Sequence, residues 1–405
     1  MLWWGYVMWI LRKTNYTLLK YKFLYIFFIS QVIYSQQFRN ITDISDLNGI
    51  VGNNGVAVAD YDQDGDLDIF IVSENGYENI SRLLQNTNNG NFIDVTENSG
   101  INQNLNHEID LINYDDNGEF SFDTIEHGDR LAASWGDFNN DGYPDLFLGN
   151  AVQSELYKNN GNGTFSNITE SAGFEISCEK CYIAGALWLD YDLDGYLDIF
   201  LSDYNQISPN KLYRNLGDET FQQIDLTTYI ENSNSFSAIP IYANDDMYPD
   251  IYIANDFDQF NQLLINQEGQ GFIEMAEEYG VEDPFDGMGL TTCDFNNDLS
   301  IDFFVTNIKE NSLYTKDTSN NSFAYTNYSE EANLYDTDWA WGVTFSDFNH
   351  DGFEDFYVAN GFFDPENDRF FINDSGNNFT YADFSGNPPL MSKSRSVNSF
   401  DYDND

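Results

Sequence analysis

A short acidic segment recurs along this chain, and its plainest copy reads Asp60-Tyr61-Asp62-Gln63-Asp64-Gly65-Asp66-Leu67-Asp68. Carboxylates stand at positions 1, 3, 5 and 9, and a glycine stands at position 6. Ca²⁺ takes about six to eight oxygen ligands, and loops with this spacing wrap such oxygens around one ion while the glycine allows the sharp turn. Position 7 is expected to contribute its backbone carbonyl, so its side chain can vary.

The acidic segment is the landmark of a repeat. Its seven copies begin at residues 60, 137, 190, 242, 294, 347 and 401, which gives intervals of 77, 53, 52, 52, 53 and 54 residues. A Phe recurs in the same register at 38, 92, 165, 221, 272, 323 and 379. Each repeat holds four apolar segments separated by turn residues, which favours a four-stranded antiparallel sheet over a helical repeat.

We therefore predict an all-β fold, a seven-bladed β-propeller of four-stranded antiparallel blades that occupies residues 36–405. The chain begins in the middle of a repeat, so a strand at residues 38–42 is expected to complete the last blade and remove its exposed edge. The seventh loop supplies Asp401, Asp403 and Asp405 and then stops. That last blade is predicted to be truncated, as in a fragment of a longer protein.

The loops differ in how many ligands they keep. Four copies keep every side-chain ligand and the glycine, and the copy at 294 keeps the ligands but has Leu299 at the glycine position. The copy at 242 has lost the acidic residue at position 1 and has Met247 at the glycine position, although Asn244, Asp246 and Asp250 remain. We expect four strong Ca²⁺ sites, one weaker site and one lost site, with these ligands: Asp60, Asp62, Asp64, Asp66, Asp68, Asp137, Asn139, Asp141, Tyr143, Asp145, Asp190, Asp192, Asp194, Tyr196, Asp198, Asp294, Asn296, Asp298, Asp302, Asp347, Asn349, Asp351, Phe353 and Asp355.

Two other interpretations of the loops are less consistent with the sequence. An acidic turn without metal would bring four carboxylates together unneutralised, and they would repel one another. An EF-hand needs flanking helices and a Glu at loop position 12, whereas position 12 of the first loop is Ile71 within a strand-like run.

One interval is about 25 residues too long, because residues 102–129 form an insertion between the first and second repeats. Long insertions on one face of a repeat fold often form part of a binding surface. A solvated extension without a partner is the alternative. The insertion contains His107, Asp110 and His127.

Charge and the N-terminus bear on location and partners. The formal charge is −52, from 68 acidic and 16 basic residues, so the chain has no electrostatic footprint for nucleic acid. Lys20 and Lys22 precede an apolar run, which predicts a signal peptide at residues 1–35 cleaved after Ser35. The alternative is an uncleaved anchor, since residues 1–10 are also apolar. We expect a secreted or cell-surface protein with no membrane span in the mature chain.

The three cysteines have separate interpretations. Cys178 and Cys181 are spaced to close a small disulfide loop outside the cell, although the sequence does not settle whether they do. Cys293 precedes a cation loop and is expected to be a buried structural thiol.

Three phrases carry a family resemblance: Trp135-Gly136-Asp137-Phe138-Asn139-Asn140-Asp141-Gly142, Leu156-Tyr157-Lys158-Asn159-Asn160-Gly161-Asn162-Gly163-Thr164-Phe165 and Tyr252-Ile253-Ala254-Asn255-Asp256-Phe257. With them the chain resembles the FG-GAP and VCBS-type repeats, whose β-propeller also occurs in integrin α chains. It is most similar to the cartilage-acidic-protein-like secreted proteins, which usually continue into an ASPIC/UnbV domain. The resemblance implies a calcium-binding propeller. The Phe-Gly and Gly-Ala-Pro triplets of integrins are missing, so it does not imply an integrin-like ligand site.

Two function classes remain. The first is a binding or adhesion module for an extracellular protein or glycan, with structural calcium. The second is a calcium-dependent, lyase-like enzyme acting on polysaccharides, which needs a positioned base and cationic groups for an acidic sugar. Histidine occurs only at positions 107, 127 and 350, and basic residues are few, so the sequence favours a non-catalytic binder. Trp339 and Trp341 suggest a sugar platform, but their position before a loop favours packing between blades.

Overall fold

The computed structural model describes residues 53–73, 81–87, 90–101, 109–114, 120–125, 130–150, 154–174, 181–205, 208–226, 233–244, 246–257, 259–316, 323–361, 366–382, 391–392 and 394–403. The chain divides into two units, Met1–Arg39 and Asn40–Asp405, and all of the described residues belong to the second. The predicted signal peptide at 1–35 and the predicted closing strand at 38–42 lie outside the described residues.

Six four-stranded antiparallel sheets, or blades, are present among the described residues. Within each sheet, successive strands along the chain are neighbours, so every blade is a meander. The first three blades comprise β1 (Asn53–Ala59), β2 (Asp68–Ser73), β3 (Arg82–Asn86) and β4 (Phe92–Asp94); β7 (Arg130–Gly136), β8 (Asp145–Asn150), β9 (Glu155–Asn159) and β10 (Phe165–Asn167); and β11 (Ile183–Leu189), β12 (Asp198–Asp203), β13 (Lys211–Asn215) and β14 (Phe221–Ile224).

Blades 4 to 6 repeat this plan with small departures. They comprise β15 (Ser235–Ile241), β16 (Asp250–Asn255), β17 (Gln262–Asn266) and β18 (Phe272–Glu274); β19 (Leu290–Cys293), β20 (Asp302–Val305), β21 (Ser312–Lys316) and β22 (Tyr325–Asn327); and β23 (Ala340–Ser346), β24 (Asp355–Asn360), β26 (Arg369–Asn373) and β27 (Phe379–Tyr381). Shorter elements are the 3-10 helix η1 (Thr96–Asn98), the helix α3 (Ala276–Tyr279), the hairpin of β5 (Ile109–Tyr114) and β6 (Phe120–Ile125), and the pair β25 (Glu366–Asn367) with β28 (Met391–Ser392).

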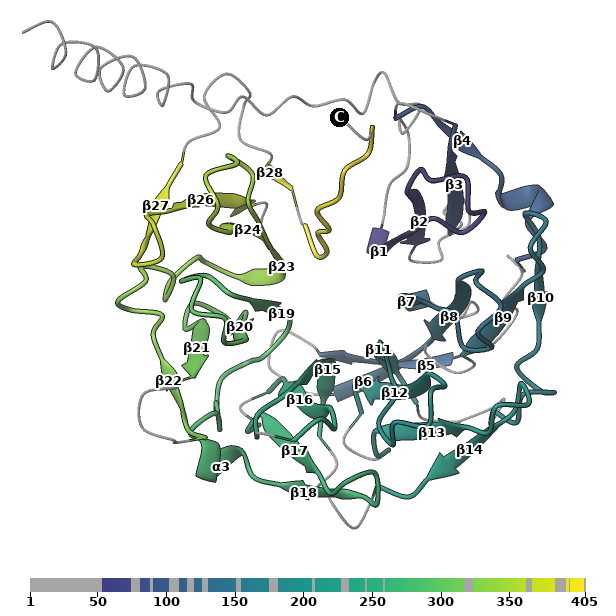
Figure 1. The fold of residues 1–405 in the computed structure, drawn as a ribbon, viewed down its shortest axis with the longest axis horizontal. Helices are drawn as coiled ribbons and strands as arrows, with labels where there is room; N and C mark the ends of the chain where they lie inside the picture. The colour runs from purple at the N-terminus through teal and green to yellow at the C-terminus, as the bar shows by residue number, and fades with distance from the viewer. Residues whose placement is uncertain are drawn as a thin grey trace, which may run out of the picture. The chain divides into compact units, whose positions relative to one another are not determined.

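The first strands of the blades lie side by side around a common centre (Figure 1). Each first strand contacts the first strand of the next blade, from β1 and β7 through β11, β15 and β19 to β23. The fourth strands lie at the outside of the ring of blades (Figure 1). This arrangement is a β-propeller, and the predicted all-β class is confirmed.

The predicted blade number was wrong, because the structure has six four-stranded blades and not seven. The seventh repeat contributes the segment 394–403, which has no strand and packs between blades 6 and 1. Ser399 Oγ lies 2.9 Å from Thr344 Oγ1 of β23, Asn398 Nδ2 donates to the Val56 carbonyl of β1 at 2.8 Å, and Phe400 packs against the apolar side chains of blade 1. Among the described residues this segment pairs with no second strand, so it forms no sheet.

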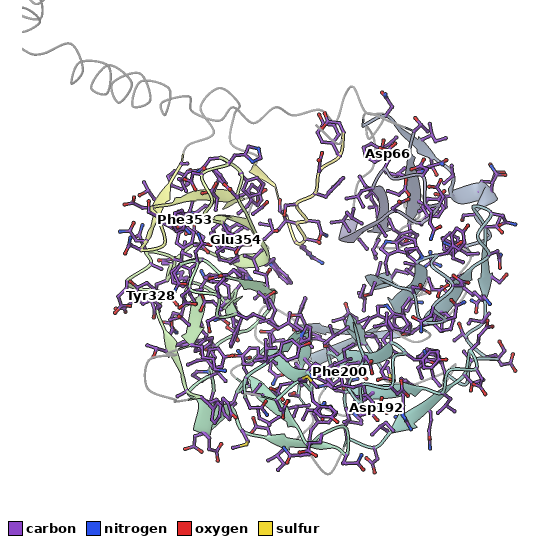
Figure 2. The ribbon with its side chains drawn as sticks, in the orientation of Figure 1. Asp66, Asp192, Phe200, Tyr328, Phe353 and Glu354 are labelled. Carbon is purple, nitrogen blue, oxygen red and sulfur yellow. The ribbon has the colours of Figure 1, made fainter. Side chains whose placement is uncertain are left out.

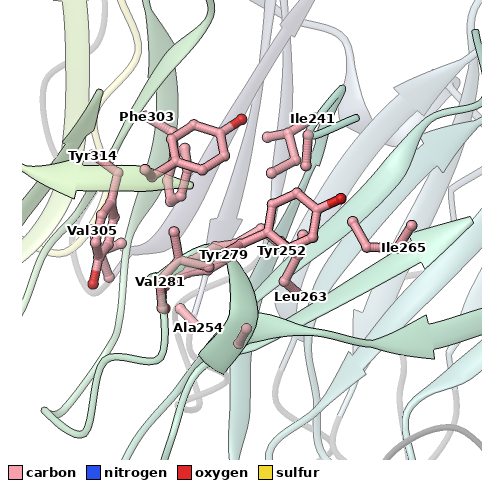
Figure 3. Packing of buried hydrophobic residues seen from close by; sticks show 13 residues of the cluster. Ile241, Tyr252, Ala254, Leu263, Ile265, Tyr279, Val281, Phe303, Val305 and Tyr314 are labelled. Atoms are coloured by element: carbon pink, nitrogen blue, oxygen red, sulfur yellow. Dashed lines mark hydrogen bonds between the residues drawn. The ribbon is translucent and has the colours of Figure 1, made fainter. Parts of the chain in front are cut away.

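Apolar side chains fill the space between neighbouring blades. Figure 3 shows the cluster between blades 4 and 5, where Tyr252 of β16 packs against Phe303 of β20 with ring centroids 4.6 Å apart. The second strands are buried along nearly their whole length because a neighbouring blade covers each face, which explains their continuous apolar runs.

The fourth strands account for the recurring Phe, with one exception. Phe92, Phe165, Phe221, Phe272 and Phe379 are the buried first residues of β4, β10, β14, β18 and β27. In blade 5 the strand starts at Tyr325, which is buried, whereas Phe323 is 42% exposed. The expectation that Phe323 marks the same position was therefore wrong by two residues, which is one full period of a strand.

Successive blades are linked by an asparagine at the end of the third strand, a residue type that we call the bracket asparagine. The side chain of Asn215 donates to the Phe138 carbonyl of the preceding blade at 2.8 Å and to the Leu197 carbonyl of its own blade at 3.1 Å. Asn86, Asn159, Asn266 and Asn373 make the corresponding pairs of bonds. The partner of Asn86 is Tyr402, so the segment 394–403 joins blade 1 through the same contact that joins the other blades.

We expect Asn215→Ala to lower the free energy of unfolding by about 2 kcal/mol or more, because the buried Phe138 carbonyl and the partly buried Leu197 carbonyl lose their donor. Asn98→Ala, an exposed change in η1, is the control and should stay within about 0.5 kcal/mol. Urea unfolding of both variants is the measurement. Equal stability of the two would show that the bracket contributes nothing to cohesion between blades.

Candidate metal sites

The predicted acidic loops connect the first and second strands in all six blades, and we number them loops 1 to 6 by blade. The aspartate at position 9 is always the first residue of the second strand and is 0% exposed: Asp68, Asp145, Asp198, Asp250, Asp302 and Asp355. Figure 2 labels Asp66, Asp192 and Phe353, which belong to the loops of three different blades. The blades therefore place the loops at equivalent positions.

Backbone hydrogen bonds hold the front half of each intact loop. In loop 2 the carboxylate of Asp137 accepts the N–H groups of Asp141 at 3.0 Å and Gly142 at 2.9 Å, and Asp141 accepts the N–H of Tyr143 at 2.9 Å. Loops 1, 3 and 6 repeat these bonds. The glycine at position 6 has φ between 91° and 94° in the four loops, a conformation that other residues rarely adopt.

The position-9 aspartates are buried carboxyl groups whose ionised form is disfavoured. Asp145 accepts the N–H of Asn159 at 2.7 Å and that of Phe138 at 3.3 Å, yet burial still raises its pKa to about 8. Burial likewise raises the pKa of Asp68 to about 8, of Asp198 and Asp302 to about 7, and of Asp250 and Asp355 to about 6. Neighbouring loop carboxylates also raise these pKa values. The side chains therefore resist ionisation unless positive charge is supplied.

The structure gathers several predicted ligands closely enough to share one ion. One oxygen each of Asp60, Asp62 and Asp68 lie within 4.8 Å of one another, and so do oxygens of Asp190, Asp192 and Asp194. Buried acceptor oxygens without a hydrogen-bond partner occur in the loops, namely Asp192 Oδ1, Asn349 Oδ1 and Asp355 Oδ2. An unpaired buried acceptor is costly, and these atoms fit a hard cation that binds oxygen.

Loop 3 differs from the others because a basic side chain reaches into it. Arg214 Nε lies 2.6 Å from Asp192 Oδ2, and Arg214 Nη2 lies 3.1 Å from Asp194 Oδ2. The corresponding residues are Gln85 in blade 1 and Lys158 in blade 2, where Lys158 pairs with Glu219. The guanidinium therefore neutralises part of the charge that an ion in loop 3 would use.

The two degenerate loops keep the loop backbone. In loop 4, Asp246 still accepts the N–H of Tyr248 at 2.9 Å, while Tyr242 at position 1 is 47% exposed. In loop 5, Asp294 accepts the N–H of Leu299 at 3.1 Å, and Leu299 stands at φ 66° with 93% of its surface exposed. The side chain of Leu299 thus adds backbone strain without adding packing.

A polar cavity of about 380 Å³ adjoins loop 2. Its lining includes Asn139 and Asp141 of the loop, together with Lys158, Asp218 and Glu219. Two of the predicted ligands of loop 2 are therefore accessible from a hollow of the surface.

Sequence reasoning missed Arg214 and the bracket asparagines. The asparagines had a visible signal, since the third apolar segment ends in Asn in five of the six blades, as in Leu212-Tyr213-Arg214-Asn215. In blade 5 the same place is taken by Lys316, which has no amide with which to bridge the blades. Arg214 had no comparable signal, because its partners are set by the fold of the loop.

Other residues singled out by the sequence take these places. His350 is exposed at position 4 of loop 6, with φ 57°, while His107 and His127 lie outside the described residues. Trp341 is partly buried and contacts Phe236 of blade 4. Cys181 is disulfide-bonded, and Lys211 Nζ lies 2.7 Å from its sulfur. Cys293 is a buried free thiol, as expected, and burial raises its pKa.

Replacement of Leu299 by Gly should stabilise the protein by about 0.5–1 kcal/mol, because it removes left-handed strain at a residue that packs against nothing. Leu299→Ala keeps the strain and serves as the control. Chemical unfolding should rank Gly above both Leu and Ala. A Gly variant less stable than the Ala variant would contradict the strain argument.

The raised pKa values predict that the metal-free protein loses stability as pH rises. A folded pKa near 8 against an ordinary value of 3.8 means that Asp145 contributes stability below about pH 4 that is lost by about pH 8. In EDTA we expect a higher thermal midpoint at pH 5 than at pH 8, and Asp145→Asn should flatten this dependence. An identical pH slope in wild type and Asp145→Asn would contradict the prediction.

Comparisons with known proteins agree with this architecture. The FG-GAP-like repeat family matches residues 137–185 and 294–358, which contain loops 2, 5 and 6. Cartilage acidic protein 1 of Xenopus tropicalis is 28% identical over 174 residues, which is 42% of this chain and 22% of that protein. This chain therefore spans about a fifth of the length of that relative.

A search of solved structures returned an Agrocybe aegerita lectin described as recognising non-reducing terminal N-acetylglucosamine, at 16% identity and TM-score 0.48, covering 83% of this chain and 82% of the lectin. BBS1N in complex with ARL6DN is 10% identical with TM-score 0.45, covering 82% of each chain. The resemblance stated from the sequence is confirmed by the repeat match and the homologue together: this chain contains FG-GAP-like repeats, folds as a β-propeller and is similar to cartilage acidic protein 1.

Proposed function

We propose that this chain is an exported, calcium-binding β-propeller that acts as a binding or adhesion module for an extracellular protein or glycan. The observation that carries the proposal is the set of buried position-9 aspartates, whose pKa values are raised by burial in loops that also hold unpartnered acceptor oxygens. A bound cation compensates these charges and rigidifies the loops. Rigid blades with fixed loops are a common basis for recognition surfaces.

The donor set favours Ca²⁺ among biological cations. The ligands offered by loops 1, 2, 3 and 6 are carboxylate, amide and backbone oxygens, with no thiolate and no imidazole except the exposed His350. Calcium accepts such flexible oxygen shells, whereas Mg²⁺ demands a tighter octahedron and retains water. The ion would hold the turn between the first and second strands, and it would have a structural and not a catalytic role.

The loops are expected to differ in affinity. Loops 1, 2 and 6 offer carboxylates without an intruding cation, whereas Arg214 competes for Asp192 and Asp194 in loop 3. Loop 5 carries the strain of Leu299, and loop 4 lacks the position-1 carboxylate. Extracellular calcium modules bind Ca²⁺ with dissociation constants of about 10⁻⁴–10⁻³ M, a range that suits exposed loops of this kind.

The sequence supports the proposal of export, and the strand connectivity supports a position for the partner. The predicted signal peptide at 1–35 supports export, and none of the described helices is long and apolar enough to cross a membrane. The insertion at 102–129 includes the hairpin β5–β6 and lies in the connection from β4 to β7. Connections from a fourth strand to the next first strand leave the propeller on the side opposite the loops, so we place the partner on that side.

Calcium should raise the thermal midpoint of the EDTA-treated protein, because binding to the folded state alone stabilises it by mass action. A matched pair locates the effect: Asp137→Ala and Tyr242→Ala change position 1 of loops 2 and 4 to the same residue. The calcium-induced shift should shrink in Asp137→Ala and remain in Tyr242→Ala. No shift in the wild type would defeat the calcium proposal.

The binding proposal is tested with an array of extracellular proteins and glycans probed in calcium with the intact chain and with a variant lacking residues 104–127. We expect a partner that binds the intact chain and binds the deletion variant at least about tenfold more weakly, the loss of roughly 1.4 kcal/mol of contact. Equal binding by both would remove the insertion from the proposal. Calcium-dependent release of unsaturated sugars from a polysaccharide would replace it with the lyase-like alternative.

A further inference from the structure

The side of the propeller opposite the calcium loops carries a continuous set of aromatic side chains, which we call the aromatic row: Tyr182, Tyr204, Phe236, Phe257 and Trp341. Tyr182 immediately precedes β11 and Tyr204 follows β12, while Phe236 and Trp341 lie near the starts of β15 and β23 and Phe257 follows β16. First strands start, and second strands end, at the side remote from the loops that connect them. The row therefore belongs to blades 3, 4 and 6 and to one side of the molecule.

The rings contact one another in sequence. Ring centroids are 5.8 Å apart for Tyr182 and Tyr204, 5.3 Å for Tyr204 and Phe236, and 5.5 Å for Phe236 and Trp341. Phe257 branches from Tyr204 at 5.9 Å. Backbone bonds fix the base of the row, since the N–H of Tyr204 donates to the Tyr182 carbonyl at 2.8 Å and Tyr204 forms a bridge with Asn234. The row is preorganised and is longer than one small ligand.

The ring of Phe257 is exposed to solvent by a strained backbone conformation. Phe257 is 42% exposed and stands at φ 61°, a left-handed conformation that is unusual for a bulky residue. The side chain of Asp256 accepts its N–H at 2.8 Å and helps to hold this conformation. Backbone strain that presents an apolar ring to solvent contributes nothing to the core, and such strain is typical of binding sites.

Carboxylates flank the exposed end of the row. The Tyr204 hydroxyl donates to Asp256 at 2.5 Å, and Asp286 interacts with Asp256 and raises its pKa, in addition to the larger effect of burial. Phe260, in the same connection between β16 and β17, is another exposed ring. Aromatic faces beside half-buried carboxylates form an environment that attracts positive charge.

The other end of the row already holds a cation. The guanidinium of Arg395, in the segment 394–403, lies 5.4 Å from the ring centroid of Trp341. This distance is within the range of a cation–π contact. The chain itself therefore shows which chemical group the row accepts.

We propose that the aromatic row docks arginine and lysine side chains of a basic segment on a protein partner. This inference rests on the proposed binding function and names the chemistry of its partner. Charge complementarity supports it, because a chain of net charge −52 attracts basic segments and repels acidic ones. Arginine is favoured over lysine, since its planar guanidinium stacks on rings and pairs with carboxylates at once.

The test uses the whole chain in calcium and a fluorescent peptide of alternating glycine and arginine, with binding measured by anisotropy at physiological salt. Phe257→Leu keeps apolar bulk but removes the ring, and we expect it to weaken binding about three- to fivefold. Phe257→Tyr should bind like the wild type. Tyr242→Leu removes an exposed ring on the loop side and should have no effect. Equal affinity in Phe257→Leu and Tyr242→Leu would overturn the proposal.

A second pair separates this site from general attraction to an acidic protein. Asp256→Asn and Glu268→Gln each remove one negative charge, the first beside the row and the second in the hairpin between β17 and β18 on the loop side. Of the two variants, only Asp256→Asn should weaken binding of the arginine peptide. A thermal midpoint for each variant verifies folding. Equal losses would indicate non-specific attraction and overturn the site.

Two outcomes distinguish this inference from the function on which it rests. A partner found on the array whose binding is unchanged by Phe257→Leu and Asp256→Asn would overturn the row and leave the proposed function intact. Arginine-peptide binding at the row with no partner on the array would support the row and count against the proposed function. Tight binding of a neutral oligosaccharide such as maltohexaose, lost in Phe257→Leu, would replace the basic segment with a glycan.

Discussion

The structure depends on the buried aspartate that begins the second strand of every blade. In blade 3 that residue is Asp198, which accepts the N–H of Tyr191 from its loop at 3.1 Å and the N–H of Asn215 from the third strand at 2.7 Å. Asn215 in turn donates its side chain to Phe138 in the preceding blade. One carboxylate thus connects the loop, the blade and the neighbouring blade, so a change of its charge acts on all three.

This connection gives calcium a mechanical role in our account. The raised pKa values show that burial opposes ionisation of the position-9 aspartates, and a cation in the loop would favour the ionised form that accepts two N–H bonds. Occupied loops would therefore tighten the bracket between blades. The opposite side of the propeller has no acidic loops of this kind among the described residues and presents the aromatic row, so stiffening and recognition are assigned to different sides.

Much of the fold could be predicted from the sequence because its signals are local. Loop position and strand order follow from spacing within each repeat, and the FG-GAP resemblance rested on the same phrases. The blade number was wrong because the seventh acidic segment keeps the spacing of the others, whereas the described segment 394–403 forms no strand. Phe323 was wrongly predicted to mark the start of the fourth strand in blade 5, because a two-residue shift preserves strand alternation. Arg214 and the aromatic row were not predictable, since their partners come from different strands and, for Trp341 and Phe236, from different blades.

The most direct test of the account is anomalous diffraction from crystals grown in Ca²⁺, recorded at a long wavelength where calcium scatters anomalously. The account predicts peaks inside loops 1, 2 and 6, each within ligand distance of the oxygens at positions 1, 3, 5 and 9, and no peak in loop 4. A weaker peak is predicted in loop 3, where Arg214 must withdraw from Asp192. Loops 1, 2 and 6 without anomalous density, at calcium concentrations above those outside cells, would contradict the central claim.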